Sequence, residues 1–312
     1  MLGSDVELYL QSLRSANLSP NTLRAYSHAL QGLTEFVGPE TEAREINVSV
    51  MRAYVHMLAA KVSPETRNHA MRVFKAFGEF LVDEGIVGEN VFRLIPQAKA
   101  PIRMIDPPTV EVMTTLLDGE IPTNWPARDR AELELLYGTG VRVQEAAGIR
   151  MPDLLADGTI LIHGKGGKER RVPVGVPLRQ ALDTYLPERE TVLRRRKQQT
   201  DALFFECKNP SCHYNPCFEK LSRQPEPINV RSIHRVLLKV CAAKGLQPMH
   251  PHLLRHACAT HMSNNGAPLV VIKQLLGHAK LSTTALYAFV SVALMQRTYN
   301  AAHPNAQRVA AA

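Results

Sequence analysis

The thirteen residues from 250 to 262, HPHLLRHACATHM, hold four histidines around one arginine. His252 and His256 are four residues apart, so a helix would place them on one face, where two imidazoles could bind zinc. No glutamate lies between them as in the His-Glu-x-x-His sequence of metalloproteases, and the pattern therefore does not favour a zinc enzyme. Arg255 follows His252 by three residues, so at the start of a helix both side chains can converge on one object. A guanidinium fork beside an imidazole suits a phosphate group.

Four other residues of suitable chemistry lie in short segments on either side. Arg142 follows a glycine-rich turn in GTGVRVQEAAGIR, and Lys165 lies in the predicted hairpin turn of HGKGGKER. In KQLLGHAKLSTTALY a helix is predicted to end at Gly277, which exposes His278 in a turn, and Tyr287 lies on the next helix. Two arginines, a lysine, two histidines and a tyrosine are sufficient for phosphoryl transfer without a metal. The arginines neutralise the non-bridging oxygens, the tyrosine attacks, and the other groups move the protons.

The composition of the whole chain is compatible with an enzyme that acts on a polyanion. With 312 residues the chain is long enough for two domains, and 45% hydrophobic residues is typical of a globular protein. The net charge of +8 favours nucleic acid as the partner, although an acidic protein or a membrane surface would also attract this charge. No apolar run has the ~18 residues of a membrane span, and the N-terminus does not resemble a secretory signal, so we expect a cytoplasmic protein. Five cysteines, an odd number, do not favour a disulfide framework.

The first 96 residues predict a small helical domain. Ser19 with Pro20, and Ser63 with Pro64, are N-cap and first-turn residues of two helices, and a further helix is predicted around residues 48–60. Basic residues remain for the outside of the bundle, where each one alone is best explained as a solvated charge: Arg24, Arg67, Arg72 and Lys75.

Residues 97–108 are rich in proline and basic residues without periodicity, which predicts a linker between the two domains. The second domain, 109–312, begins with predicted helices at 109–118 and 128–140. A β-hairpin follows, with strands at 159–163 and 169–174, and then a helix at 179–199. The rest is mostly helical to about residue 301. The fold class is therefore mainly α, of the α+β type, with a small β-sheet in the second domain.

Five segments in this order resemble the tyrosine recombinases, and most of all the bacterial Xer type. They are GTGVRVQEAAGIR, HGKGGKERRVPV, HPHLLRHACATHM, LLGHAKLSTTALY and the tail YAFVSVALMQRTYNAAHPNA. The order and spacing of these motifs agree across the whole second domain. Five ordered motifs are far more specific than a single short one. The resemblance implies that the first domain is a SAM-like core-binding domain and the second the catalytic domain of a site-specific DNA recombinase.

The resemblance also implies a role for each candidate residue. Tyr287 would attack the scissile phosphate and form a 3′-phosphotyrosyl bond, while Arg142 and Arg255 would clamp the phosphate. Lys165 would be the general acid for the departing 5′-oxygen; Lys168 lies in the same turn, and only the family pattern distinguishes the two. Since the covalent bond keeps the energy of the phosphodiester, the reaction needs neither ATP nor a metal, and we expect no cofactor.

Two histidines have roles by resemblance and three do not. His252 would assist proton transfer at Tyr287, and His278 would hydrogen-bond the phosphate. The remaining histidines of 250–262 are predicted to be packing or surface residues: His250, His256 and His261. Glu145 is left open between a surface charge and a residue that orients a basic neighbour.

An insertion of about twenty residues, at about 206–228, departs from the family pattern. It contains Cys207, Cys212, His213 and Cys217, but their spacing is not that of a Cys-x-x-Cys zinc knuckle, so free thiols are the better expectation. Phe289 stands where the family frequently has a histidine, which removes no catalytic role.

A tail helix is predicted at about 290–301, with Val292, Met295 and Tyr299 on one face. The pattern alone predicts that this face packs on its own domain. The resemblance implies instead that it docks on a neighbouring subunit.

The expected function is cleavage and rejoining of duplex DNA at an inverted-repeat site, through a Holliday junction, by a homo- or hetero-tetramer on two DNA sites. The expected task is chromosome or plasmid dimer resolution, with or without an accessory activator protein. The alternatives are a phage or mobile-element integrase, a type IB topoisomerase, and a DNA-binding regulator without catalytic activity. All six chemical residues are present, which argues against the regulator, and the tail helix favours assembly over a topoisomerase.

Overall fold

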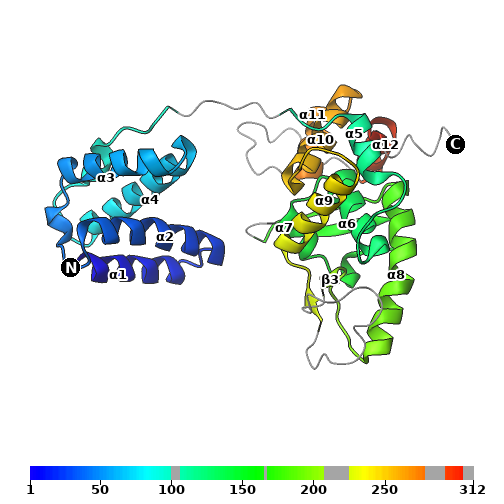
Figure 1. Ribbon diagram of the computed structural model, residues 1–312, viewed down its shortest axis with the longest axis horizontal. Helices are drawn as coiled ribbons and strands as arrows, with labels where there is room; N and C mark the ends of the chain where they lie inside the picture. The colour runs from blue at the N-terminus through cyan, green and yellow to red at the C-terminus, as the bar shows by residue number, and fades with distance from the viewer. Residues whose placement is uncertain (100–105, 165–166, 207–224, 278–291, 305–312) are drawn as a thin grey trace. The chain divides into compact units, whose positions relative to one another are not determined.

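The computed structural model describes residues 1–99, 106–164, 167–206, 225–277 and 292–304. The chain forms two compact units, Met1–Met104 and Ile105–Ala312 (Figure 1). Each unit has its own cluster of buried apolar side chains.

Unit 1 is helical. Its helices are α1 (Leu2–Ser15), α2 (Pro20–Val37), α3 (Val48–Lys61) and α4 (Pro64–Asp83), with short 3-10 helices at Ala43–Glu45 and Val91–Leu94. The predicted caps are confirmed, since the hydroxyls of Ser19 and Ser63 each accept a hydrogen bond from the backbone N–H three residues later. The core between the helices is rich in aromatic rings, including Tyr9, Tyr54, Phe74 and Phe77.

Unit 2 is built around α6 (Pro126–Thr139), whose side chains are buried without interruption from Ala131 to Thr139. A helix that is buried on all sides must be enclosed by others. Those that pack on α6 include α5 (Val110–Leu117), α7 (Val143–Ala147), α8 (Val176–Arg196), α9 (Val230–Ala243) and α10 (Pro251–Asn264). Figure 1 shows α8 running along one side of this unit.

The predicted hairpin is present as β1 (Thr159–His163) and β2 (Glu169–Pro173), which pair antiparallel. Ile160 lies opposite Val172, and Ile162 lies opposite Arg170. Since alternate residues of a strand share one face, Arg170 lies on the same face as these buried apolar residues. A second pair, β3 (Phe205–Glu206) with β4 (Glu226–Pro227), was not predicted. The fold class is confirmed: the protein is mainly α with small β-sheets.

Helix α8 begins and ends three residues before the predicted 179–199. It begins after Gly175, with Pro177 in its first turn, and it ends at Arg196, before Lys197, whose backbone is left-handed (φ 52°). Pro187 is accommodated within the helix. None of the described helices is both long and apolar enough to cross a membrane.

The tail helix, α12 (Val292–Ala302), packs on its own unit. Met295 and Tyr299 are buried, the Tyr299 ring stacks on His303, and Asn265 donates a hydrogen bond to the Ala302 carbonyl. This is the packing that the periodicity alone predicts. Docking on a neighbouring subunit stays a prediction.

Candidate active site

Arg142 begins α7, directly after the turn that ends α6. Gly140 ends α6 in a left-handed conformation (φ 62°), which glycine adopts without strain, and Arg142 is the N-cap of the next helix. The Arg142 backbone N–H donates to Oε2 of Glu145 at 2.9 Å, and Nη1 donates to Oε1 at 2.9 Å. The Arg142 side chain is 43% exposed, whereas that of Glu145 is only 6% exposed. The buried Glu145 therefore holds Arg142 from the protein side, and the other side of the Arg142 guanidinium stays open to solvent.

Arg255 lies on the inward face of α10 and is almost completely buried. Its Nη1 donates to the Gly140 carbonyl at 2.6 Å and its Nη2 to the Leu276 carbonyl at 2.8 Å. Burial and the nearby Arg142 cation lower the pKa of the Arg255 guanidinium to about 10, so it remains charged at neutral pH. Its two hydrogen-bond acceptors among the described residues are neutral carbonyls, and these two bonds use two of its five N–H donors. A buried cation in this setting is stabilised by an anionic ligand.

The end of α11 (Leu269–Leu276) brings three arginines together. Three consecutive carbonyls accept hydrogen bonds there: Leu275 from Nε of Arg170 at 2.8 Å, Leu276 from Arg255 at 2.8 Å, and Gly277 from Nη2 of Arg142 at 3.5 Å. The last carbonyls of a helix lack partners within the helix and carry the negative end of its dipole, which explains why cations gather at this point. We call Arg142, Arg170 and Arg255 the arginine cluster.

Glu145 is the carboxylate of the arginine cluster. Besides Arg142, it accepts hydrogen bonds from Arg170, with Nη1 to Oε1 at 3.1 Å and Nη2 to Oε2 at 2.7 Å. Burial raises the pKa of the Glu145 carboxyl, but the hydrogen bonds from Arg170 and Arg142 outweigh burial and lower the pKa to about 2. Three cations and one anion leave an excess of positive charge, which suits a phosphodiester and the additional charge of its transition state.

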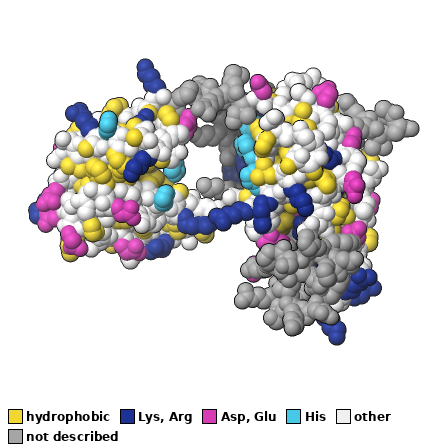
Figure 2. Space-filling model, in the orientation of Figure 1, with side chains coloured by type: hydrophobic (Ala, Val, Ile, Leu, Met, Phe, Trp, Pro, Cys, Tyr) yellow, Lys and Arg dark blue, Asp and Glu magenta, His cyan; other side chains and the backbone are white. Residues whose placement is uncertain are grey.

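His252 lies in the first turn of α10 with its side chain exposed. Its ring is 4.6 Å from the ring of His256, centroid to centroid, and 6.4 Å from that of His250. Burial of part of the ring, His256 and Arg255 together lower the pKa of His252, so its imidazole is neutral at neutral pH and can accept a proton. Figure 2 shows exposed histidine side chains gathered on unit 2.

The other histidines of this segment are surface or packing residues, as predicted. His250 and His256 are exposed. His261 is buried, and its Nδ1 lies 2.9 Å from the hydroxyl of Tyr137.

Three of the six predicted catalytic residues lie outside the described residues: Lys165, His278 and Tyr287. The same holds for Cys207, Cys212, His213 and Cys217, so zinc binding by the insertion stays untested. Among the residues that the structure does describe, no three His, Cys, Asp or Glu side chains come together as a metal site. Cys241 and Cys258 are buried thiols.

The structure thus brings Arg142 and Arg255 together, with His252 nearby, and adds two residues to this set. Glu145 orients a basic neighbour, which decides the question that the sequence left open. Arg170 was missed, although strand alternation in the predicted hairpin places it on the same side as Val172, facing inward. A cation at an inward position of a strand needs an acceptor or an anion as its partner. This requirement is the sequence signal that could have identified Arg170.

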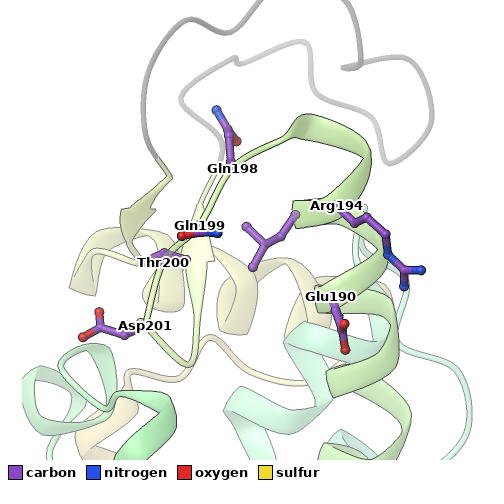
Figure 3. A pocket seen from close by; sticks show the side chains of 7 residues that line it. Glu190, Arg194, Gln198, Gln199, Thr200 and Asp201 are labelled. Atoms are coloured by element: carbon purple, nitrogen blue, oxygen red, sulfur yellow. The ribbon is translucent and has the colours of Figure 1, made fainter.

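An open pocket lies where α8 ends, with Glu190 and Arg194 on the helix and Gln198 to Asp201 on the loop that follows (Figure 3). The described members of the predicted catalytic set, Arg142, His252 and Arg255, do not line it, and neither does Arg170. It is therefore separate from the arginine cluster.

The sequence matches two family models. The model described as "Phage integrase family" matches residues 109–293, and "Phage integrase, N-terminal SAM-like domain" matches residues 6–85. Among curated relatives, tyrosine recombinase XerC of Listeria monocytogenes is 37% identical over 308 residues, which are 96% of each chain. Tyrosine recombinase XerD of Mycobacterium tuberculosis is 33% identical over 296 residues, covering 91% of this chain and 90% of the relative.

Solved structures share the fold at lower identity. A lambda integrase dimer bound to a COC′ core site superposes with a TM-score of 0.68 at 17% identity, covering 91% of this chain and 98% of that one. The XerH recombinase bound to a palindromic difH substrate gives a TM-score of 0.66 at 19% identity, covering 99% of this chain and 84% of that one.

Proposed function

The chain belongs to the phage integrase family and is a site-specific tyrosine recombinase of the Xer type, and from this premise we propose that it cuts duplex DNA through a covalent bond to Tyr287. The observation that carries the proposal is the arginine cluster. Arg142 and Arg255 come from segments more than a hundred residues apart, yet they donate to adjacent carbonyls at the end of α11. Two guanidiniums fixed side by side can bind both non-bridging oxygens of one phosphate.

In the proposed reaction, the Tyr287 oxygen attacks the scissile phosphorus while the bond from phosphorus to the 5′-oxygen breaks. The phenol proton passes to His252, and Lys165 supplies a proton to the departing 5′-oxygen, which leaves as a hydroxyl. Arg142, Arg255 and His278 bind the phosphate oxygens as negative charge develops on them. Attack by a 5′-hydroxyl of a second strand reverses these steps and rejoins the DNA, so no external energy source is needed.

We assign the DNA contacts to both units. Most of the affinity comes from Lys and Arg contacts to phosphates, whereas base recognition falls to exposed or half-exposed cations of unit 1, with Arg24, Arg67 and Arg72 as the first candidates.

The proposed substrate is a pair of inverted-repeat sites bound by four subunits, with a Holliday junction as the intermediate. Solved structures of this fold include a lambda integrase tetramer bound to a Holliday junction, which supports such an assembly. The task that the resemblance to the Xer type implies, resolution of chromosome or plasmid dimers in the cytoplasm, is the one we propose over phage integration. The relatives named XerC and XerD support the Xer type.

The test is covalent capture. The protein is incubated with fragmented genomic DNA of its source organism and denatured, and the DNA that stays attached is sequenced, with Tyr287→Phe as the control. We expect attached DNA with the wild type alone, with ends that converge on one inverted-repeat site. If both proteins bind DNA and neither retains it after denaturation, the cleavage proposal fails and a DNA-binding regulator without catalytic activity replaces it.

A further inference from the structure

Among the described residues, the Arg170 side chain donates three hydrogen bonds, whereas those of Arg142 and Arg255 donate two each. It donates twice to Glu145, on α7, and once to the Leu275 carbonyl, on α11, and it belongs to strand β2. We propose that Arg170 is a positioning residue of the recombination reaction, which sets the place of Arg142 through Glu145 and ties the end of α11 to the hairpin. The inference rests on the proposed function of the arginine cluster.

Arg170 differs sharply from the next residue of the same strand. Its side chain is 11% exposed and lies on the inward face opposite Ile162, whereas the Arg171 side chain is 53% exposed and pairs with Asp157 at 3.2 Å. A surface arginine of this kind contributes little to structure. Arg171 is therefore a matched control for Arg170, with the same side chain one position away.

Two glycines show how closely Arg170 and Glu145 approach the backbone beside the predicted catalytic residues. A Cβ atom on Gly277 would lie 2.9 Å from Nη1 of Arg170, and one on Gly164 would lie 3.8 Å from Oε1 of Glu145. These glycines directly precede His278 and Lys165 in the sequence. The Arg170 guanidinium thus packs directly on the backbone at Gly277, and the Glu145 carboxylate lies near the backbone at Gly164.

A lysine cannot make the same contacts. Arg170 uses Nε and both Nη nitrogens, which diverge in one plane, for acceptors on two different helices. A lysine ammonium has a single nitrogen, so it can contact Glu145 or Leu275 with good geometry but not both.

The first test is single-turnover cleavage of a nicked duplex that carries the captured site. Arg170→Lys and Arg170→Met are compared with the wild type and with Arg171→Met, together with the Kd for the same DNA and a thermal melt. Because a misplacement of about 1 Å can cost roughly 10²-fold in rate, we expect both Arg170 variants to cleave roughly 10²-fold more slowly, with Kd within about threefold of the wild type. Arg171→Met is expected to cleave like the wild type.

A pH profile distinguishes positioning from a general loss of structure. Glu145 faces Arg142 on its own helix, Arg170 on β2 and Arg255 on α10. Without Arg170, burial raises the pKa of the Glu145 carboxyl with less opposition, and a protonated Glu145 no longer holds Arg142 as an ion pair. The ratio of the Arg170→Met rate to the wild-type rate should therefore fall further as the pH is lowered from about 8 to about 5.5. A ratio that does not change with pH contradicts the mechanism.

Hydrogen exchange provides a measurement that does not depend on cleavage. In Arg170→Met, the amides of residues 142–147 and the end of α11 should exchange faster than in Arg171→Met, because Glu145 accepts the Arg142 N–H. Equal exchange in the two variants overturns the inference even if no cleavage is observed. If the wild type itself forms no covalent bond to DNA, the proposed function fails instead, and the exchange data still decide whether Arg170 holds Arg142 and the end of α11 in place.

Discussion

At the scale of residues, the site depends on one carboxylate that balances several cations. Three guanidiniums at the end of one helix would repel one another, and Glu145 offsets this repulsion by hydrogen bonds to two of them. The third, Arg255, donates to the backbone carbonyls of Gly140 and Leu276. Glu145 therefore keeps the cluster assembled, while enough positive charge remains to bind a phosphate.

Replacing Glu145 by Gln should destabilise unit 2 in a way that depends on pH. The folded-state pKa of about 2 lies below the ordinary value of 4.5, so the stabilisation is fully present above about pH 4.5 and is lost as the pH falls toward 2. The shift corresponds to at most roughly 3 kcal/mol at neutral pH. Urea denaturation of both proteins between pH 7 and pH 3 measures the difference, which should shrink on acidification.

Glu169, which lies on β2 next to Arg170, supplies the control, because its side chain is 55% exposed. Glu169→Gln should change the free energy of unfolding by only a small amount at every pH. A Glu145→Gln effect that is the same at pH 7 and pH 3 would mean that the ion pairs with Arg142 and Arg170 do not carry the stabilisation.

The predicted residues of the site are identified by local sequence motifs, whereas the missed residue is identified as part of the site only by contacts between distant parts of the chain. Arg142, His252 and Arg255 lie in short motifs, so residue type and local spacing were enough to predict them. Arg170 is 25 residues from Glu145 and 105 from Leu275, and no local pattern shows that a strand residue will meet a helix end so far away. Glu145 was ambiguous for the same reason, since its second partner comes from β2.

At the scale of elements, local signals predicted helices better than they predicted packing. The starts of α2 and α4 and the end of α11 at Gly277 follow from cap residues, which act within one turn. The two-residue strands β3 and β4 have no such signal, because their pairing joins the two ends of the insertion, about twenty residues apart in the sequence. The periodicity of the tail predicted a buried face, and the structure shows that this face packs on unit 2.

The packing of α12 can be tested through one glycine. Gly175 lies against the Tyr299 ring, and a Cβ atom there would be only 2.6 Å from Cε1. Gly175→Ala should therefore cost about 1–3 kcal/mol of stability, because the ring must shift to make room. In a Tyr299→Leu background most of this cost should disappear, apart from a difference of up to about 1 kcal/mol for alanine at the N-cap of α8.

Urea denaturation of the four proteins gives the coupling between the two positions. A coupling of about 1 kcal/mol or more indicates that α12 packs on its own unit in solution. If Gly175→Ala costs the same in both backgrounds, Tyr299 does not occupy this place, and the tail is available to a neighbouring subunit.

At the scale of the whole molecule, the charge is distributed unequally between the two units. Residues 1–104 contain 11 Lys and Arg and 11 Asp and Glu, so unit 1 has no net charge, while residues 105–312 contain 26 and 18 and carry the entire net charge of +8. Long-range attraction to DNA depends on net charge, whereas base recognition depends on a few side chains. Unit 2 should therefore supply most of the non-specific affinity, and unit 1 most of the discrimination between sequences.

The salt dependence of binding to a random-sequence duplex tests this division. If about six phosphates are neutralised, log K should fall against log salt with a slope of roughly −5, which is a loss of roughly 10³ in affinity between 50 and 200 mM salt. Since each unit has its own core, fragments 1–104 and 105–312 can be measured beside the full chain. Fragment 105–312 should retain most of the slope, and fragment 1–104 should bind the random duplex weakly. A steeper slope for fragment 1–104 would mean that a local group of cations, such as Arg24, Arg67 and Arg72, outweighs the net charge, and non-specific binding would then belong to unit 1.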